Sequence, residues 1–254
     1  MRLHLVSDVH GAVEALRRAG EGADALICLG DLLCFLDYFD YNAGVFGTLF
    51  GSESVARLVE LRTAGRFDDA REWSRSLWAG LPDSRRAMDE AIDAQYAEMF
   101  AAMPTPTYAT YGNVDLPDRW ARHIHDGIRV LDGEVTEIGG LRFGFVGGGL
   151  QTPMRTPYEV SDSDYAVKVE GLGPVDVLCS HIPPAIPELT FDVLARRLER
   201  GSVALRDAIL EHQPSLMFFG HVHQPLVART RIGRTECINV GHFAGTKLPY
   251  VLDL

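Results

Sequence analysis

Five short apolar runs, each ending abruptly at a small or polar residue, constrain the fold of this chain more than any other feature of its 254 residues. Runs of this length, made of apolar and aromatic residues, are typical of strands buried on both faces. They occupy residues 3–6, 25–29, 107–111, 175–179 and 216–219. Helical spacing between some of them, as at residues 12–19 and 202–212, predicts a mainly parallel sheet in an α/β protein.

A helical stretch interrupts this alternation. Residues 52–103 carry apolar side chains at helical spacing, and Pro104 and Pro106 close the stretch. We therefore expect a single domain over residues 1–254 with a helical insertion at about residues 36–103. The insertion could serve as a lid, as a dimer face in a homo-oligomer, or as structural padding without a function of its own. Residues 134–146 predict a hairpin around Gly139-Gly140, and the last strands are expected between residues 226 and 254.

Composition excludes several classes of partner. The chain has 24 Lys plus Arg against 35 Asp plus Glu, a net charge of −11, which argues against extended nucleic acid as a ligand. No apolar run approaches the roughly 18 residues of a membrane span, and no apolar leader opens the chain, so we expect no membrane partner. The four cysteines show no CxxC spacing, which is typical of a cytoplasmic protein.

Polar clusters close the five predicted strands. They are Asp8-Val9-His10, Gly30-Asp31, Gly112-Asn113-Val114-Asp115, Ser180-His181 and Gly220-His221-Val222-His223. An isolated Asp-x-His triplet arises by chance, but strand ends of an open sheet meet at one edge, where ligands bind. So many buried Asp, His and Asn side chains would not gather without a cation. The pair His123 and His125 follows no apolar run and is predicted to lie on the surface.

These residue types suit two metal ions. Asp8 and His10 alternate along an extended segment and can point the same way, as can His221 and His223. Asp31 can bridge two ions. Mixed carboxylate and imidazole ligands favour Mn, Fe, Zn or Ni, and we expect two divalent ions with Mn favoured. Such a pair can activate a shared hydroxide for in-line attack at phosphorus.

At these residues the chain resembles the calcineurin-like metallophosphoesterase superfamily. The superfamily motifs run in the order Asp-x-His, Gly-Asp, Gly-Asn-His-Asp or Gly-Asn-His-Glu, a lone His, and Gly-His-x-His, and four of the five occur unaltered between residues 8 and 223. The resemblance implies a four-layer α-β-β-α sandwich. It implies two ligand sets that share one carboxylate: Asp8, His10, Asp31 and His223 for one metal, and Asp31, Asn113, His181 and His221 for the other. Catalytic roles are predicted for Asp31, Asn113, His181 and Asp115.

Two departures from the superfamily pattern narrow the function. Val114 replaces the motif His, which in the family protonates the leaving oxygen or steadies the phosphoryl group, a loss worth ~10²–10⁴-fold for a general acid. Resembling subgroups that lack this His are phosphodiesterases acting best on good leaving groups. Without its His, the role of Asp115 is open. The residues after Asp31 lack the arginine of protein Ser/Thr phosphatases, which argues against that activity.

Two further segments carry weaker signals. Gly147-Gly148-Gly149 and the following Thr-Pro loop resemble the Icc-related bacterial and archaeal phosphoesterases, and predict substrate contacts from Thr152 and Arg155; a proline-stiffened turn is the alternative. His242 is predicted as a turn residue, with an approach to the site as the alternative. Trp73 and Trp78 are predicted as core residues of the insertion.

The interpretation that these patterns favour is a phosphodiesterase acting on a small or nucleotide-like phosphorylated substrate. A phosphomonoesterase or pyrophosphatase on the same site is the first alternative. A partner-binding scaffold that keeps the fold without catalysis is a second, and a nucleic-acid endonuclease is disfavoured by the charge.

Overall fold

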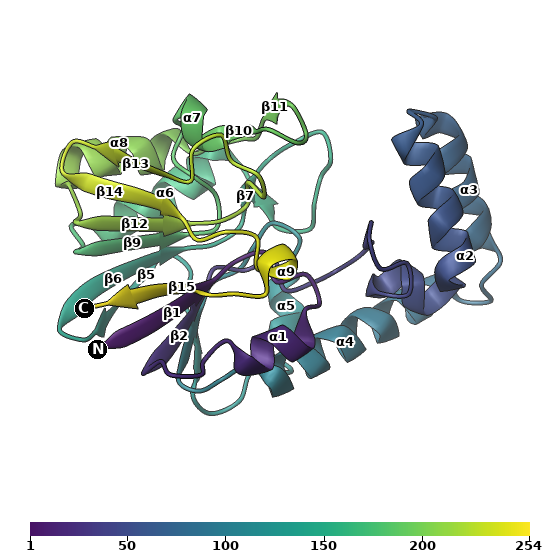
Figure 1. Ribbon diagram of the computed structural model, residues 1–254, viewed down its shortest axis with the longest axis horizontal. Helices are drawn as coiled ribbons and strands as arrows, with labels where there is room; N and C mark the ends of the chain where they lie inside the picture. Colours follow the sequence, from purple (N-terminus) through teal and green to yellow (C-terminus); the bar gives the residue numbers. More distant parts are fainter.

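Two large mixed sheets form the centre of the computed structural model, which describes residues 1–254 (Figure 1); the first has one antiparallel edge strand and the second has two. The first sheet has the order β15 (Tyr250–Asp253), β1 (Arg2–Val6), β2 (Ala25–Cys28), β3 (Thr107–Ala109) and β4 (Ile128–Val130). The second has the order β13 (Arg229–Ile232), β14 (Thr235–Asn239), β12 (Leu216–Phe219), β9 (Val177–Ser180), β6 (Leu141–Val146) and β5 (Glu134–Ile138).

Two short strand pairs and nine helices complete the chain. The pairs are β7 (Gly149–Leu150) with β8 (Glu159–Val160), and β10 (Phe191–Asp192) with β11 (Arg197–Leu198). The helices are α1 (Val13–Arg18), α2 (Gly44–Thr63), α3 (Phe67–Ala79), α4 (Ser84–Ala102), α5 (Pro117–Trp120), α6 (Asp162–Leu172), α7 (Pro187–Thr190), α8 (Val203–His212) and α9 (Phe243–Thr246).

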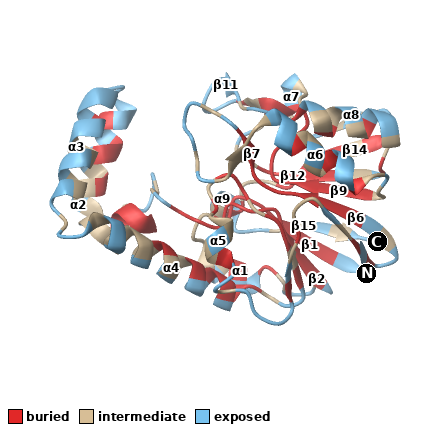
Figure 2. Ribbon diagram, turned by 180° about the vertical axis from the view of Figure 1, so that it is seen from behind, coloured by how far each residue is buried: buried red, intermediate tan, exposed pale blue.

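Alternating side chains of the central strands explain why the sheets stack. Leu3 and Leu5 of β1 pack between the two sheets, whereas Val6 packs on the side of α1. On β12, Phe218 faces the first sheet, and Met217 and Phe219 face α6 and α8. The central strands of each sheet are therefore buried on both faces and are almost continuously apolar (Figure 2).

Helices cover the two outer faces. Leu16 of α1 and Met99 of α4 join the core of the first sheet, while Tyr165 of α6 and Ile209 of α8 join that of the second. Figure 1 shows these layers one above the other, with both termini at the same edge of the sheets. The expected four-layer α-β-β-α sandwich is confirmed.

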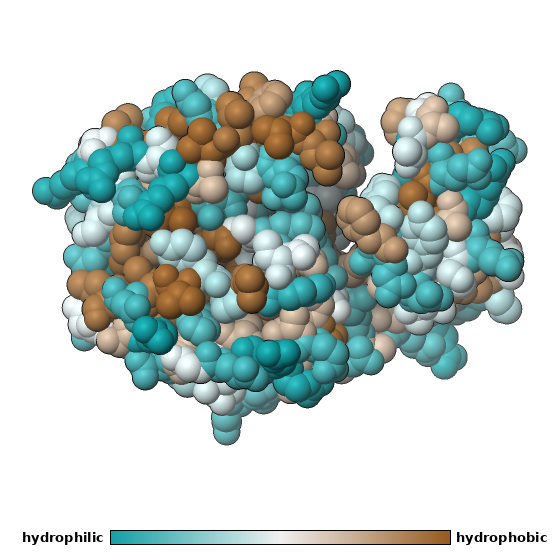
Figure 3. All heavy atoms as spheres, in the orientation of Figure 1, coloured by the Kyte–Doolittle hydropathy of each residue, from teal (hydrophilic) through white to brown (hydrophobic).

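The predicted helical insertion divides into two parts. In α2 the backbone leaves helical geometry at Gly51, and beyond this point α2 and α3 form an arm that stands apart from the body (Figures 1 and 3). The arm has its own apolar cluster, which includes Val55 and Leu58, with Trp73 and Trp78 packed against it. Helix α4 instead places Tyr96 and Met99 in the core of the first sheet. The hypothesis that all of residues 52–103 could be buried without the sheet is therefore wrong for α4.

The five predicted strands and the hairpin at residues 134–146 are confirmed within a few residues. The C-terminal segment differs: β13 and β14 form a hairpin in the second sheet, but β15 crosses to the first sheet and pairs antiparallel with β1. No helix of the chain has the length and apolar character that crossing a lipid bilayer requires.

Strand register aligns the carboxyl ends. Val6 lies beside Cys28, and Cys28 beside Ala109, so the loops after β1, β2 and β3 leave the first sheet at one level. In the second sheet Phe218 pairs with both Cys179 and Ile238. The mutually parallel strands of both sheets point to the same side of the molecule (Figure 1), where the polar clusters gather.

Candidate metal centre

The loops that follow five parallel strands supply all the predicted ligands. Four of these side chains sit on a left-handed backbone, with φ of 56° at Asp8, 39° at His10, 55° at Asp31 and 67° at His221. Residues other than glycine adopt this conformation at a cost, and it concentrates at functional sites. The chain therefore carries local backbone strain where these side chains turn toward one another.

The first predicted ligand set is brought together. Oδ1 of Asp8 lies 3.3 Å from Nε2 of His223, and Nε2 of His223 lies 3.4 Å from Nε2 of His10. Oδ2 of Asp31 lies 3.8 Å from Nε2 of His10. Ligand atoms of Asp8, His10 and Asp31 all lie within 4.8 Å of one another, close enough to share one ion.

The second set meets around the amide of Asn113. Its Oδ1 lies 2.9 Å from Nε2 of His181 and 2.9 Å from Nδ1 of His221. Oδ2 of Asp31 lies 3.5 Å from Nε2 of His181. The Asp31 carboxylate thus stands between the two groups, as a bridging ligand must.

Backbone carbonyls fix the orientation of two imidazoles. Nδ1 of His10 lies 3.0 Å from the carbonyl oxygen of Leu33, and Nδ1 of His181 lies 2.8 Å from that of Leu29. A carbonyl only accepts, so both rings donate from Nδ1 and turn Nε2 into the site. Metal-binding histidines are held by this kind of contact.

The donor set fits divalent metal ions. Oδ1 of Asp8 is buried and has no hydrogen-bond partner, although carboxylate oxygens in protein interiors are normally paired. The facing Nε2 atoms of His10 and His223 are 3.4 Å apart, and two nitrogens that each bind one ion at about 2.1 Å are separated by at most ~4.2 Å. An ion between these atoms would satisfy all three.

The electrostatics of the site favour positive charge. Burial opposes ionisation of Asp8, but contact with His223 and neighbouring histidine charges hold its pKa well below the usual range. At Asp31, burial is likewise outweighed by His181, and the pKa is about 2. At His181 the charge of Asp31 outweighs burial and raises the pKa to about 9. At His221 burial and the charge of His181 lower the pKa to about 4. Two buried carboxylates stay ionised at neutral pH and require cations beside them.

Asp115 faces backbone amides. Its Oδ2 accepts hydrogen bonds from the N–H groups of Asp31 and Gly112, and its Oδ1 accepts from Leu32 and lies 3.4 Å from the Tyr96 hydroxyl. Burial and the charge of Asp31 raise its pKa to about 6. These hydrogen bonds hold the loop that carries Asp31 in place, and the predicted catalytic role of Asp115 stays a prediction.

A hydrogen-bond relay orients Asn113. Its Nδ2 donates to Oγ1 of Thr156 at 3.0 Å, and Thr156 Oγ1 donates to Oε1 of Glu159 at 2.7 Å. Thr156 has one hydroxyl proton and gives it to Glu159, so it can only accept from Asn113. The relay directs the carbonyl oxygen of Asn113 toward His181 and His221.

A cavity of about 280 Å³ opens on this site, lined by His10, Asp31, Asn113, His221 and His223 among others. The expected substrate residue Thr152 lines it, with its hydroxyl bound to Glu159. Arg155 does not line it and is exposed, and its contact with substrate stays a prediction. Arg197 and Arg200 line the cavity instead. No sequence signal marked these two, because the β10–β11 hairpin folds over the site from a segment without a motif.

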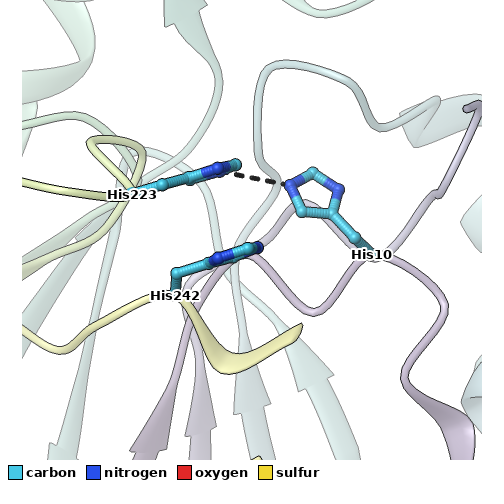
Figure 4. A group of neighbouring side chains, drawn as sticks. All are labelled: His10, His223 and His242. Carbon is cyan, nitrogen blue, oxygen red and sulfur yellow. Dashed lines mark hydrogen bonds between the residues drawn. The ribbon is translucent and has the colours of Figure 1, made fainter. Parts of the chain in front are cut away.

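His242 adjoins the site, which overturns its prediction as a plain turn residue. Its ring stacks on that of His223, with centroids 4.0 Å apart and planes 1° from parallel, and lies 5.9 Å from the ring of His10 (Figure 4). Burial and the charge of His223 lower its pKa to about 4. The missed signal was β14, a sixth strand whose end leads through Gly241 to a histidine. His123 and His125 remain outside the site, beside Phe100.

Fold and site together define a metal-binding α/β sandwich with its ligands at the strand ends. The sequence model of the family described as calcineurin-like phosphoesterase matches residues 1–225, and the chain belongs to this family. Membership supports a metal-dependent phosphoesterase, a hydrolase of phosphoric esters, and the family typically uses a dinuclear metal centre. No curated protein matches the sequence significantly.

Two solved structures align with the chain. Protein TT1561 of Thermus thermophilus aligns with a TM-score of 0.53 and 14% identity, over 99% of this chain and 98% of that chain. The purple acid phosphatase PPD1 from yellow lupin seeds aligns with a TM-score of 0.46 and 13% identity, over 100% of this chain and 46% of that chain. At such identities the likeness to the first extends to the fold alone.

Proposed function

We propose that this phosphoesterase is a phosphodiesterase that hydrolyses small or nucleotide-like phosphodiesters with two divalent transition-metal ions, Mn favoured. Asp8, His10, Asp31 and His223 would hold one ion, and Asp31, Asn113, His181 and His221 the other. When bound, the ions supply an activated water and positive charge for the phosphoryl oxygens. The observation that carries the proposal is Val114 in the cavity lining, a side chain that cannot donate a proton to a leaving group.

Val114 shapes the chemistry at the leaving group. Its backbone N–H donates to Oδ1 of Asp31 at 3.0 Å, and its side chain lines the cavity where the family places an imidazole. A valine cannot protonate a departing oxygen. Esters whose leaving groups are stable anions, such as aryl diesters, depend least on this proton.

The charge of the cavity favours a diester, which carries a single negative charge. Arg197 is paired with Glu199 at 2.7 Å, and Arg200 is paired with Asp162 at 2.9 Å. The charge of each guanidinium is therefore partly balanced by a carboxylate, which weakens its attraction for the second charge of a monoester dianion. Glu159, Asp192 and Glu199 add acidic groups to the same wall and would repel a more highly charged substrate.

A paired comparison of esters tests the proposal. Protein stripped with a chelator and reloaded with Mn²⁺ is assayed on an aryl phosphodiester and on the phosphomonoester of the same phenol. We expect a higher kcat/KM for the diester, and no activity for an Asp31→Asn variant, which loses the shared carboxylate. A higher kcat/KM for the monoester would favour a phosphomonoesterase. Bound metal without hydrolysis of either ester would favour a partner-binding scaffold.

A further inference from the structure

A third histidine stands beside His10 and His223 that no motif accounts for. In Figure 4 the rings of His223 and His242 lie parallel and both extend toward His10, which reaches in from the opposite side. One ring nitrogen from each of the three residues lies within 4.8 Å of the others. The carbonyl oxygen of His242 accepts helix hydrogen bonds from Gly245 and Thr246, whereas its ring nitrogens have no partner within the protein.

The backbone holds His242 firmly in this position. It precedes the short helix α9, whose first N–H groups, from Phe243 and Ala244, donate to the carbonyl oxygens of Ser7 and Asp8 at 3.0 Å each. This contact attaches the start of α9 directly to the end of β1. The imidazole is therefore fixed next to the loop that carries the Asp8 and His10 ligands.

Asn239 joins the loops of His242 and His223. Its Nδ2 donates to the carbonyl oxygen of Val222 at 2.9 Å, and its Oδ1 accepts from the N–H of Gly241 at 2.8 Å. Asn239 is itself buried at the end of β14. One buried side chain thus holds the loop of His242 beside the loop of His223.

We propose that His242 is an additional ligand residue of the metal centre, supplying a third imidazole to the ion of His10 and His223. This inference rests on the metal centre of the proposed function. The nitrogens of His10 and His223 already face each other at 3.4 Å, and His242 offers an unengaged nitrogen on the same side. A set of three imidazoles with a carboxylate suits Zn, Fe, Ni or Mn and disfavours Mg and Ca.

Val114 cannot donate a proton to the leaving group. The position of His242 argues against His242 taking that role. His10, His223 and Val114 line the cavity, but His242 does not. It approaches His223 across the ring face, from outside the cavity wall. Because an imidazole binds a metal ion in its own ring plane, the His242 ring must turn out of its stack on His223 for a nitrogen to reach the ion that His10 and His223 would hold, whereas a substrate in the cavity would contact the other three residues.

The test separates a ligand from a stacking partner. His242→Ala removes the nitrogens and the ring, and His242→Phe removes the nitrogens but keeps an aromatic face against His223. His212→Ala, at the end of α8 on the far side of the second sheet, is the matched control. Each chelated protein is titrated with Mn²⁺ and Zn²⁺ against a chelating indicator, and the visible absorption of the Co²⁺ form is recorded.

We expect both His242 variants to bind one of two equivalents at least ~10-fold more weakly and to show a changed Co²⁺ spectrum, with His212→Ala unchanged. Wild-type affinity and spectrum in His242→Phe would reduce the role to stacking, and the same result in both variants would return His242 to a turn residue. Either outcome overturns the inference and leaves the proposed function intact. A wild-type protein that binds no metal would overturn both.

Discussion

At the scale of single residues, Val114 decides how hydrolysis responds to the leaving group. A histidine placed here would enter the cavity lining next to the proposed centre. We expect Val114→His to accelerate hydrolysis of alkyl diesters more than of aryl diesters, by less than the ~10²-fold low end for a positioned general acid. The gain is limited because the oxygens of Asp115 already accept backbone hydrogen bonds and cannot orient the new ring.

The measurement is the slope of log kcat/KM against leaving-group pKa for wild type, Val114→His and Val114→Ala. We expect a steep slope in the wild type and a shallower one only in the histidine variant. A flat wild-type slope would mean that another residue already supplies the proton.

Thr156 tests how Asn113 is oriented. Thr156→Val removes the hydroxyl that accepts from Asn113 Nδ2 and donates to Glu159, and Thr156→Ser retains it at nearly the same place. We expect the valine variant to lose ~10–100-fold in affinity for one metal equivalent, the usual effect of removing a partner of a ligand, and the serine variant to stay near wild type. Equal losses in both variants, measured by metal titration, would assign the effect to loop packing.

At the scale of elements, the arm formed by the outer part of α2 and by α3 is separable, whereas α4 is not. The arm packs on its own cluster, but α4 buries Tyr96, Met99 and Phe100 in the core of the first sheet. Each such side chain contributes about 1.5–3 kcal/mol, so losing α4 removes a large part of a typical stability of about 5–15 kcal/mol.

We expect replacement of residues 52–81 by a short linker to give a folded protein that binds metal as the wild type does, with altered substrate preference or oligomer size. Replacing residues 52–103 is the matched comparison and should not give a folded protein. Circular dichroism, metal titration and size-exclusion chromatography measure these outcomes. Failure of the shorter deletion to fold would make the arm part of the core.

Sequence patterning predicted the elements whose environment is uniform. The central strands are buried on both faces, so their apolar runs and polar ends were visible without a structure. The sequence did not mark β14, the strand before His242, as a strand that ends at the site, because Glu236 interrupts its apolar run. Helical spacing is the same in α3 and α4, and it cannot tell which core a helix joins. Arg197 lies in the cavity lining because a hairpin distant in sequence folds over the site, which no local pattern encodes.

At the scale of the whole molecule, metal binding should stabilise the fold, because the strand-end loops of both sheets converge on the site. Ligands that bind only the folded state at ~100 times their Kd add about 2.7 kcal/mol, which raises Tm by roughly 5–10 °C for a chain of this size. We expect chelation to lower Tm by this amount and Mn²⁺ to restore it. The Asp31→Asn variant should show little response, and a wild-type Tm that is indifferent to metal would contradict a site joining the two sheets.

The most direct test of the central claim is a titration of chelated protein with Mn²⁺ while hydrolysis of an aryl phosphodiester is followed. A dinuclear centre predicts that the rate rises until about two equivalents are bound and then levels off, with no rise in Asp31→Asn. Hydrolysis that persists in the chelated protein, or two bound equivalents that bring no hydrolysis, would contradict the account.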